Sequence, residues 1–136
     1  MNMKNIMLSV ILVLLTTSVF GQFHISTNSR VDYKWNETNS EWEFDSKDEE
    51  SITFLEFNKD FTLVKHTTAS TISGYLIKSQ EHDEEDGNDQ YLFTLVSDVG
   101  NEYIMIYDIK NNNIRFITDD FTRMIKFKIK STWADE

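Results

Sequence analysis

The chain has 136 residues, a formal net charge of -10, no cysteine and no proline. So strong a negative charge is repelled by the phosphate backbone of nucleic acids and by anionic membrane surfaces, and we expect neither as a partner. Without cysteine there can be no disulfide, no thiol nucleophile and no lipid attached through a thiol.

The first 21 residues have the layout of a secretory signal peptide. Lys4 precedes the apolar run IMLSVILVLL, and Val19 and Gly21 stand at the third and first positions before a cleavage site. The run is shorter than the roughly 20 apolar residues that span a bilayer. We therefore predict a helical signal peptide over residues 1–21 that is cleaved on export, with an uncleaved anchor as the alternative. The mature protein is then periplasmic or secreted, with no membrane anchor.

Residues 22–136 are predicted to form a single all-β domain, because apolar residues recur at every second position nearly everywhere. The connections are short, and the chain lacks the helical segments that parallel crossovers need, so the strands form one antiparallel meander. Only the segment HTTASTISG (66–74) is ambiguous, and it could be a loop, a bulged strand or one turn of helix. The alternation predicts eight to nine strands, over residues 30–36, 41–45, 51–58, 61–67, 75–80, 90–97, 102–109, 113–118 and 123–130.

The meander is predicted to close into an up-and-down barrel, with a two-layer β-sandwich as the alternative. The outer face of strand 123–130 carries three lysines, and the outer face of strand 41–45 carries three acidic residues. If these strands are neighbours, their opposite charges pair across the sheet and join the beginning of the chain to its end. The lysines could instead protect an exposed edge from aggregation.

The segment HDEEDGNDQ (82–90) holds five acidic residues around one glycine. In a helix-flanked calcium loop, aligning this glycine with position six leaves a histidine at position one and a phenylalanine at position twelve, and neither fits. The flanking segments also alternate as strands. We predict a solvated loop that connects two strands, with a nonstandard calcium site of Asp83, Asp86 and Asp89 as the alternative.

No other pattern carries a defined chemistry. The three histidines, His24, His66 and His82, stand far apart, without the spacing of a zinc site. There is no serine in a glycine-flanked elbow and no phosphate-binding glycine loop. Carboxylates are so abundant that two at glycosidase separation arise by chance. We therefore assign no catalytic residue, no cofactor-binding residue, no metal ligand and no cofactor, and we favour a protein that is not an enzyme.

Aromatic residues are plentiful, with three tryptophans, five tyrosines and ten phenylalanines. Most must form the core of the sheet. A barrel of about eight strands can also hold one small molecule, and then some aromatic residues would line its cavity. A centre filled by Trp35, Tyr75 and Phe93 would exclude such a cavity.

Two features resemble known groups of proteins. The Phe20-Gly21-Gln22 junction looks like the export signals common in Bacteroidota, and FLEFNKDFT and LVSDVGNEYIMIYD resemble small exported β proteins of uncharacterised function in that group. This resemblance contains no functional motif and implies no activity and no site residue. In outline the meander is similar to lipocalin barrels, although Tyr33, not glycine, stands two residues before Trp35.

Three classes of function remain. The first is an exported noncatalytic binding or interaction module of the cell envelope, whose partner is a protein or a small apolar ligand. The second is a lipocalin-like carrier of a small apolar ligand, which requires an open barrel interior. The third is a carboxylate-based hydrolase, which requires two carboxylates in one concave pocket.

Overall fold

The computed structural model describes residues 20–49 and 52–135, and these form nine β-strands and one short 3-10 turn. All nine predicted strands are present, and β1, β2, β5 and β9 are longer than expected. β1 extends toward the start of the chain, β9 toward its end, β2 at its C-terminal end and β5 at both of its ends. The elements are β1 (Phe20–Asn36), β2 (Glu41–Asp48), β3 (Thr53–Asn58), β4 (Leu63–Thr67), β5 (Ile72–Asp83), η1 (Glu85–Gly87), β6 (Gln90–Ser97), β7 (Glu102–Asp108), β8 (Asn113–Thr118) and β9 (Arg123–Ala134).

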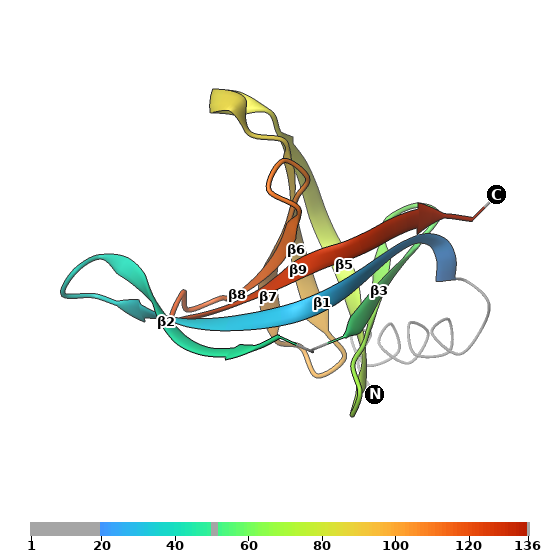
Figure 1. Ribbon diagram of the computed structural model, residues 1–136. Coiled ribbons are helices and arrows are strands. Elements are labelled where there is room, and N and C mark those ends of the chain that lie inside the picture. Colours follow the sequence, from blue (N-terminus) through green and yellow to red (C-terminus); the bar gives the residue numbers. More distant parts are fainter. Residues whose placement is uncertain (1–19, 50–51, 136) are drawn as a thin grey trace.

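The domain is a closed antiparallel barrel of eight strands, with β2 as one additional strand. Consecutive strands from β3 to β9 pair with one another, β3 pairs with β1, and β9 returns to pair with β1 (Figure 1). The predicted meander and its closure are therefore confirmed. The alternative of a two-layer sandwich is excluded, because the hydrogen-bonded ring has no open edge between β1 and β9.

The ring closes on β1, and not on strand 41–45 as the charge pattern suggested. Lys126 of β9 lies opposite Val31 of β1, whereas β2 lies along the other edge of β1. β1 has 17 residues and is long enough to pair with β9 along one edge and with β3 and β2 along the other. The prediction was wrong because exposed charge pairs contribute little energy and constrain register weakly. The lysines of β9 do not protect an edge either, since β9 is paired on both sides.

β2 and β3 follow one another along the same edge of β1. β3 pairs with residues 20–27 of β1, and β2 pairs with residues 30–36. β2 is thus the extension of β3 beyond the rim of the barrel, and the β1–β2 hairpin projects from it at the left of Figure 1. Trp35 and Trp42 lie opposite each other on this hairpin, with ring centroids 5.2 Å apart.

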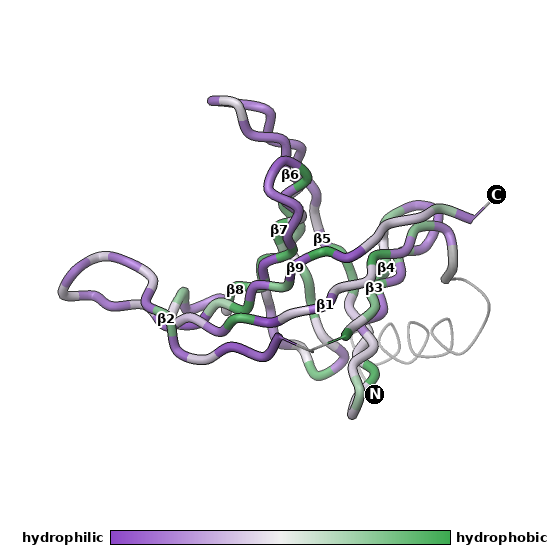
Figure 2. Tube along the Cα trace, viewed as in Figure 1, coloured by the Kyte–Doolittle hydropathy of each residue, from purple (hydrophilic) through white to green (hydrophobic). Residues whose placement is uncertain are grey.

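The middle of the barrel is filled by inward-facing apolar side chains. Figure 2 shows hydrophobic segments concentrated in the body of the barrel and hydrophilic tips on the projecting hairpins. The buried cluster comprises Ile25, Leu55, Phe57, Val64, Ile77, Phe93, Leu95, Met105, Ile114, Phe116, Phe127 and Ile129. These side chains divide the interior, so the space that remains inside the barrel lies toward its two ends.

The remaining predictions concern the segment 66–74 and the signal peptide. Residues 66–67 belong to β4 and residues 72–74 to β5, and residues 68–71 form a tight turn between them, in which the backbone N–H of Thr68 lies 2.8 Å from the carbonyl oxygen of Thr71. The predicted signal peptide lies outside the described residues except for Phe20 and Gly21, which belong to β1. No helix in the described part of the chain is long and apolar enough to cross a membrane.

Candidate functional site

An apolar cavity of about 450 Å³ lies at the end of the barrel next to the β3–β4 turn. We call it the aromatic cup, because six of its eight lining residues carry aromatic rings. Neighbouring rings pack against one another with centroids 5.2 to 6.2 Å apart, which is the range of favourable aromatic contacts. Its lining residues are Phe23, Phe57, Phe61, Gln80, Tyr91, Phe93, Tyr107 and Ile109.

The β3–β4 turn places Phe61 in the wall of this cup. The side chain of Asn58, only 7% exposed, organises the turn: its Oδ1 accepts hydrogen bonds from the backbone N–H groups of Thr62 (2.9 Å) and Leu63 (3.0 Å). Its Nδ2 donates to Thr62 Oγ1 at 2.8 Å. These bonds hold Phe61 at a φ of 55°, in the left-handed region that a bulky residue rarely adopts. The ring of Phe61 then packs 5.2 Å from that of Phe57.

The aromatic cup offers few polar groups. None of the described residues that line it is charged, and its polar atoms are the Gln80 amide and the hydroxyls of Tyr91 and Tyr107. Burial raises the pKa of Tyr107, and the negative charge of Asp89 raises it further. The Tyr107 hydroxyl therefore stays protonated at neutral pH and can donate one hydrogen bond. Such a cavity suits an apolar molecule with one or two acceptor groups, because an unpaired charge would be costly to desolvate there.

A second cavity, of about 290 Å³, lies toward the opposite end of the barrel. We call it the polar cup, because Arg30, Asp32, His66, Asp45 and Arg123 line it together with apolar side chains. Arg30 binds Asp32 in a two-point contact, with Nε–Oδ1 at 2.7 Å and Nη2–Oδ2 at 3.0 Å. This hydrogen-bonded contact raises the pKa of Arg30 against the opposing effect of burial.

His66 is the ionisable group held deepest in the wall of the polar cup. Its imidazole stacks on Phe116, with centroids 5.5 Å apart, and meets Phe127 edge-on at 5.4 Å. Burial lowers the pKa of His66 to about 4, and the charge of Arg30 adds to this effect. The imidazole is therefore neutral at pH 7. Its Nε2 is buried and has no hydrogen-bond partner among the described residues.

The polar cup also tests the hydrolase alternative, since Asp32 and Asp45 both line it. Two carboxylates thus share one concave pocket, as that alternative requires. However, both oxygens of Asp32 accept hydrogen bonds from Arg30, and this charge-assisted pair commits the carboxylate to a structural contact. Of the two carboxylates, Asp32 is thus held by Arg30, and Asp45 is the other one that lines the polar cup.

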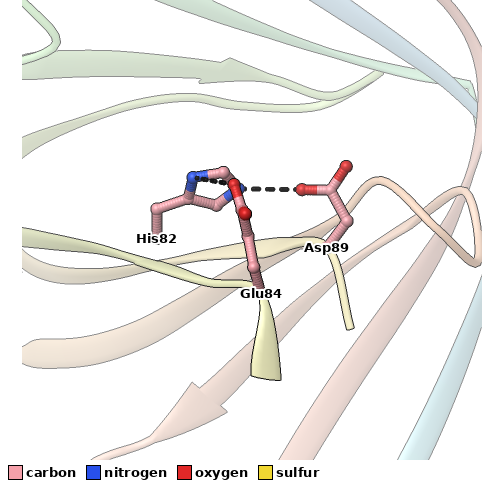
Figure 3. Close-up of side chains that lie close together, drawn as sticks. All are labelled: His82, Glu84 and Asp89. Carbon is pink, nitrogen blue, oxygen red and sulfur yellow. Dashed lines mark hydrogen bonds and ion pairs between the residues drawn. The ribbon is translucent and has the colours of Figure 1, made fainter. Parts of the chain in front are cut away.

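The acidic segment 82–90 is a hairpin loop between β5 and β6, as predicted. At its base His82 lies between two carboxylates, as Figure 3 shows. Its Nδ1 is 3.1 Å from Glu84 Oε1, and its Nε2 is 2.8 Å from Asp89 Oδ1. The ring also stacks on Tyr91 with centroids 4.2 Å apart. Both ring nitrogens are therefore engaged with carboxylates, and the arrangement fastens the loop to the end of β6.

The calcium alternative named Asp83, Asp86 and Asp89, but the structure groups different residues. Among the described residues, the one cluster with three ligand atoms within reach of a single metal ion is His82, Glu84 and Asp89. Asp83 instead accepts hydrogen bonds from the Glu85 backbone (3.0 Å) and the Gln90 amide (2.9 Å), and these bonds lower its pKa. Asp83 therefore stabilises the hairpin and is not part of that cluster.

The three residues whose filling of the centre would have excluded an interior cavity lie apart in the structure. Phe93 is 3% exposed in the core, Tyr75 lines the polar cup, and Trp35 lies on the projecting hairpin. The centre is filled by Phe93 together with other core residues, and the space described inside the barrel lies in the two cups.

Sequence reasoning missed the roles of Phe61 and of the Arg30–Asp32 pair. The alternation along strand 30–36 predicts that Val31, Tyr33 and Trp35 share one face. However, β1 shifts register against β9 between Ser26 and Ser29, and against β2 after Asp32. Val31 therefore lies outside the barrel, in a groove with Lys126, and Arg30 and Asp32 line the polar cup inside it. A signal was available, because opposite charges two residues apart lie on the same face of a strand.

Comparison of the chain with models of protein families, with curated proteins and with solved structures finds no match. The resemblance to exported β proteins of Bacteroidota therefore stays a prediction.

Proposed function

We propose that the protein is an exported, noncatalytic binding module that holds a small apolar ligand in the aromatic cup. The observation that carries this proposal is the uncharged cavity of about 450 Å³, lined by six aromatic rings, at one end of a barrel whose middle is tightly filled. Protein interiors are normally close-packed, so apolar space of this size has no benefit for stability. It falls within the range of about 300 to 1,000 Å³ typical of small-molecule sites.

The chemistry of the lining defines the ligand. Six aromatic faces favour a flat or ring-bearing molecule, and the absence of charge among the described lining residues disfavours an ionised one. The Tyr107 hydroxyl and the Gln80 amide supply hydrogen bonds for a carbonyl, hydroxyl or ether group. The proposal includes export, which rests on the layout of residues 1–21.

The first experiment is native mass spectrometry of the protein purified from its own host. A copurifying neutral organic molecule that dissociates on activation supports the proposal. A tightly held metal ion or a protein partner in its place would contradict it.

The second experiment measures binding of 1-naphthol, a neutral aromatic probe, by calorimetry. Gln80→Trp places an indole in the cup and is expected to abolish binding, because the probe and the new side chain compete for the same space. Phe44→Ala, on the projecting β1–β2 hairpin, is the matched control and should bind like the unchanged protein. Absence of binding, or equal binding by Gln80→Trp, would refute a ligand site in the cup.

A further inference from the structure

The outer wall of the barrel carries a basic groove of about 540 Å³, although the chain as a whole has a formal charge of -10. Four cationic side chains, Lys47, Arg115, Lys126 and Lys128, line this groove, and Asp108 is the one acidic residue among its described lining residues. The groove is therefore positively charged, whereas the chain as a whole is negatively charged. A high net charge that serves solubility explains the acidic surface but not this basic groove.

The strand register places three of the cations in one row across four strands. Lys47 of β2 lies opposite Val31 of β1, Val31 lies opposite Lys126 of β9, and Lys126 lies opposite Arg115 of β8. Adjacent strands are about 4.8 Å apart. Lys126 and Arg115 are thus a like-charged pair directly across two strands, an arrangement that destabilises a sheet unless an anion lies between or above the two charges.

The protein itself supplies little negative charge to this row. The carboxylate of Asp108 accepts hydrogen bonds from the Asn111 backbone (3.0 Å) and side chain (2.9 Å), and its remaining contact with Arg115 is long, at 3.4 Å. Lys47 contacts Glu49 at 3.0 Å. In the part of the chain that the structure describes, no ion pair involves Lys126 or Lys128.

The floor of the groove also has polar atoms without partners. Asn113 is 6% exposed, and its Oδ1 forms no hydrogen bond with the described residues. The Nε of Arg115 is likewise buried and unbonded. Buried polar groups in folded proteins are normally satisfied. The Nε–H of Arg115 is a donor and can bond an oxygen of an anionic ligand, whereas the Asn113 oxygen is itself an acceptor and does not support an anionic ligand.

We propose that the basic groove binds a ligand that carries two or more anionic groups of the carboxylate, phosphate or sulfate type. One anionic group would neutralise the Lys126–Arg115 pair, and a second would reach Lys47 or Lys128. Lysine serves as a mobile point charge, so these positions suit oxyanions without demanding one geometry. The site is on the outer wall, and it is independent of the aromatic cup inside the barrel.

The test uses calorimetry at low ionic strength with inorganic pyrophosphate and citrate as probes. The double variant Lys126→Gln/Lys128→Gln is compared with Lys59→Gln/Lys78→Gln, which removes the same charge away from the groove. We expect both probes to bind the unchanged protein, the groove variant to lose about tenfold or more in affinity, and the control to stay within about twofold. Added salt should weaken binding. Preference for pyrophosphate or for citrate distinguishes phosphate from carboxylate ligands.

Two measurements keep the result unambiguous. The groove variant should be at least as stable as the unchanged protein, because it removes the like-charged pair, and it should still bind 1-naphthol. Absence of binding by either probe, or an equal loss in the control variant, would overturn the proposal. So would self-association at low salt that the groove variant abolishes while neither probe binds, since the occupant would then be the acidic hairpin 82–90 of a second copy.

Discussion

The imidazole of His66 stacks on the ring of Phe116, with centroids 5.5 Å apart and planes 15° from parallel. The buried imidazole is kept neutral there, and its pKa is lowered from 6.5 to about 4. In the unfolded chain the same group takes up a proton near pH 6.5. The native and unfolded states therefore bind different numbers of protons between pH 6.5 and pH 4.

This difference predicts a pH dependence of stability. As the pH falls from 6.5 to 4, the unfolded state gains a proton that the native state does not, so the free energy of unfolding decreases. The His66 contribution is about 3 kcal/mol, fully present above pH 6.5 and fully lost below pH 4. His66→Phe should lose this part of the dependence. Urea unfolding of both proteins between pH 7.5 and 3.5 tests it, and parallel curves would show that His66 is not the group responsible.

The buried cluster in the middle of the barrel predicts that two phenylalanines contribute very differently to the free energy of unfolding. Phe57 is fully buried among Phe23, Phe61 and Phe93, whereas Phe44 on the projecting hairpin is 62% exposed. Phe57→Ala should lower the free energy of unfolding by about 3 to 5 kcal/mol, and Phe44→Ala by about 0.5 kcal/mol or less. Urea unfolding at pH 7.5 measures both. Similar losses would mean that the hairpin is part of the core.

Asn58 is expected to control both stability and the shape of the aromatic cup. Asn58→Ala leaves the N–H groups of Thr62 and Leu63 without their acceptor, at a cost of about 1 to 3 kcal/mol for each group that stays buried. It also releases Phe61 from the left-handed region, so binding of 1-naphthol should weaken.

Asn58→Asp is the control for this position, because it keeps an acceptor oxygen for the N–H groups of Thr62 and Leu63. Its second oxygen accepts from the Thr62 hydroxyl in place of the bond from Nδ2, and the added negative charge is the cost of the change. It should retain most of the stability and the probe binding. If Asn58→Ala bound the probe unchanged, Phe61 would not be part of the ligand site.

The closure of the barrel can be tested with a disulfide, because the chain contains no cysteine that could interfere. Ser26 of β1 and Ser131 of β9 are cross-strand partners with Oγ atoms 2.7 Å apart. Ser26→Cys/Ser131→Cys should oxidise readily and raise the free energy of unfolding by about 3 to 5 kcal/mol, since the closed loop is long.

The pair Glu43→Cys/Lys126→Cys represents the neighbours that the charge pattern suggested. In the structure β1 lies between these strands, so the two positions are too far apart for a disulfide. Non-reducing electrophoresis and thermal unfolding follow both variants. Efficient crosslinking of the control pair would contradict the observed strand order.

The strands could be predicted from the sequence because apolar and polar residues alternate along a strand that has one buried face and one exposed face. Tyr103, Met105 and Tyr107 face the interior together, as the alternation requires. Some of the turns also contain an asparagine or a glycine at positive φ, as at Asn112 and Gly100. The strand that closes the ring against β9 was harder to predict from the sequence. Closure depends on which long-range pairings form, and the exposed charges that we used as a guide have little energetic weight.

The cups could not be predicted because their geometry depends on local departures from regularity. Register shifts between Ser26 and Ser29 turn Arg30 and Asp32 into the barrel. Phe61 itself adopts the left-handed conformation in the β3–β4 turn, and this directs its ring into the aromatic cup. Neither feature alters the alternation of the neighbouring strands enough to be read from it. The volume of each cavity further depends on how side chains of many strands pack together, which pairwise patterns do not specify.

The two neighbours on one edge of β1 have different roles: β3 belongs to the closed ring, and β2 is the strand outside it. One edge of β1 is occupied by β9 over most of its length, while the first half of the other edge is sufficient to seal the ring through β3. The tip of the β1–β2 hairpin, residues 36–41, pairs only within the hairpin, so its length and sequence can change without breaking the circle of hydrogen bonds. Foreign segments inserted at Thr38 or Asn39 should therefore be displayed at a distance from the barrel, which makes this arm a natural place for new recognition to evolve or to be engineered.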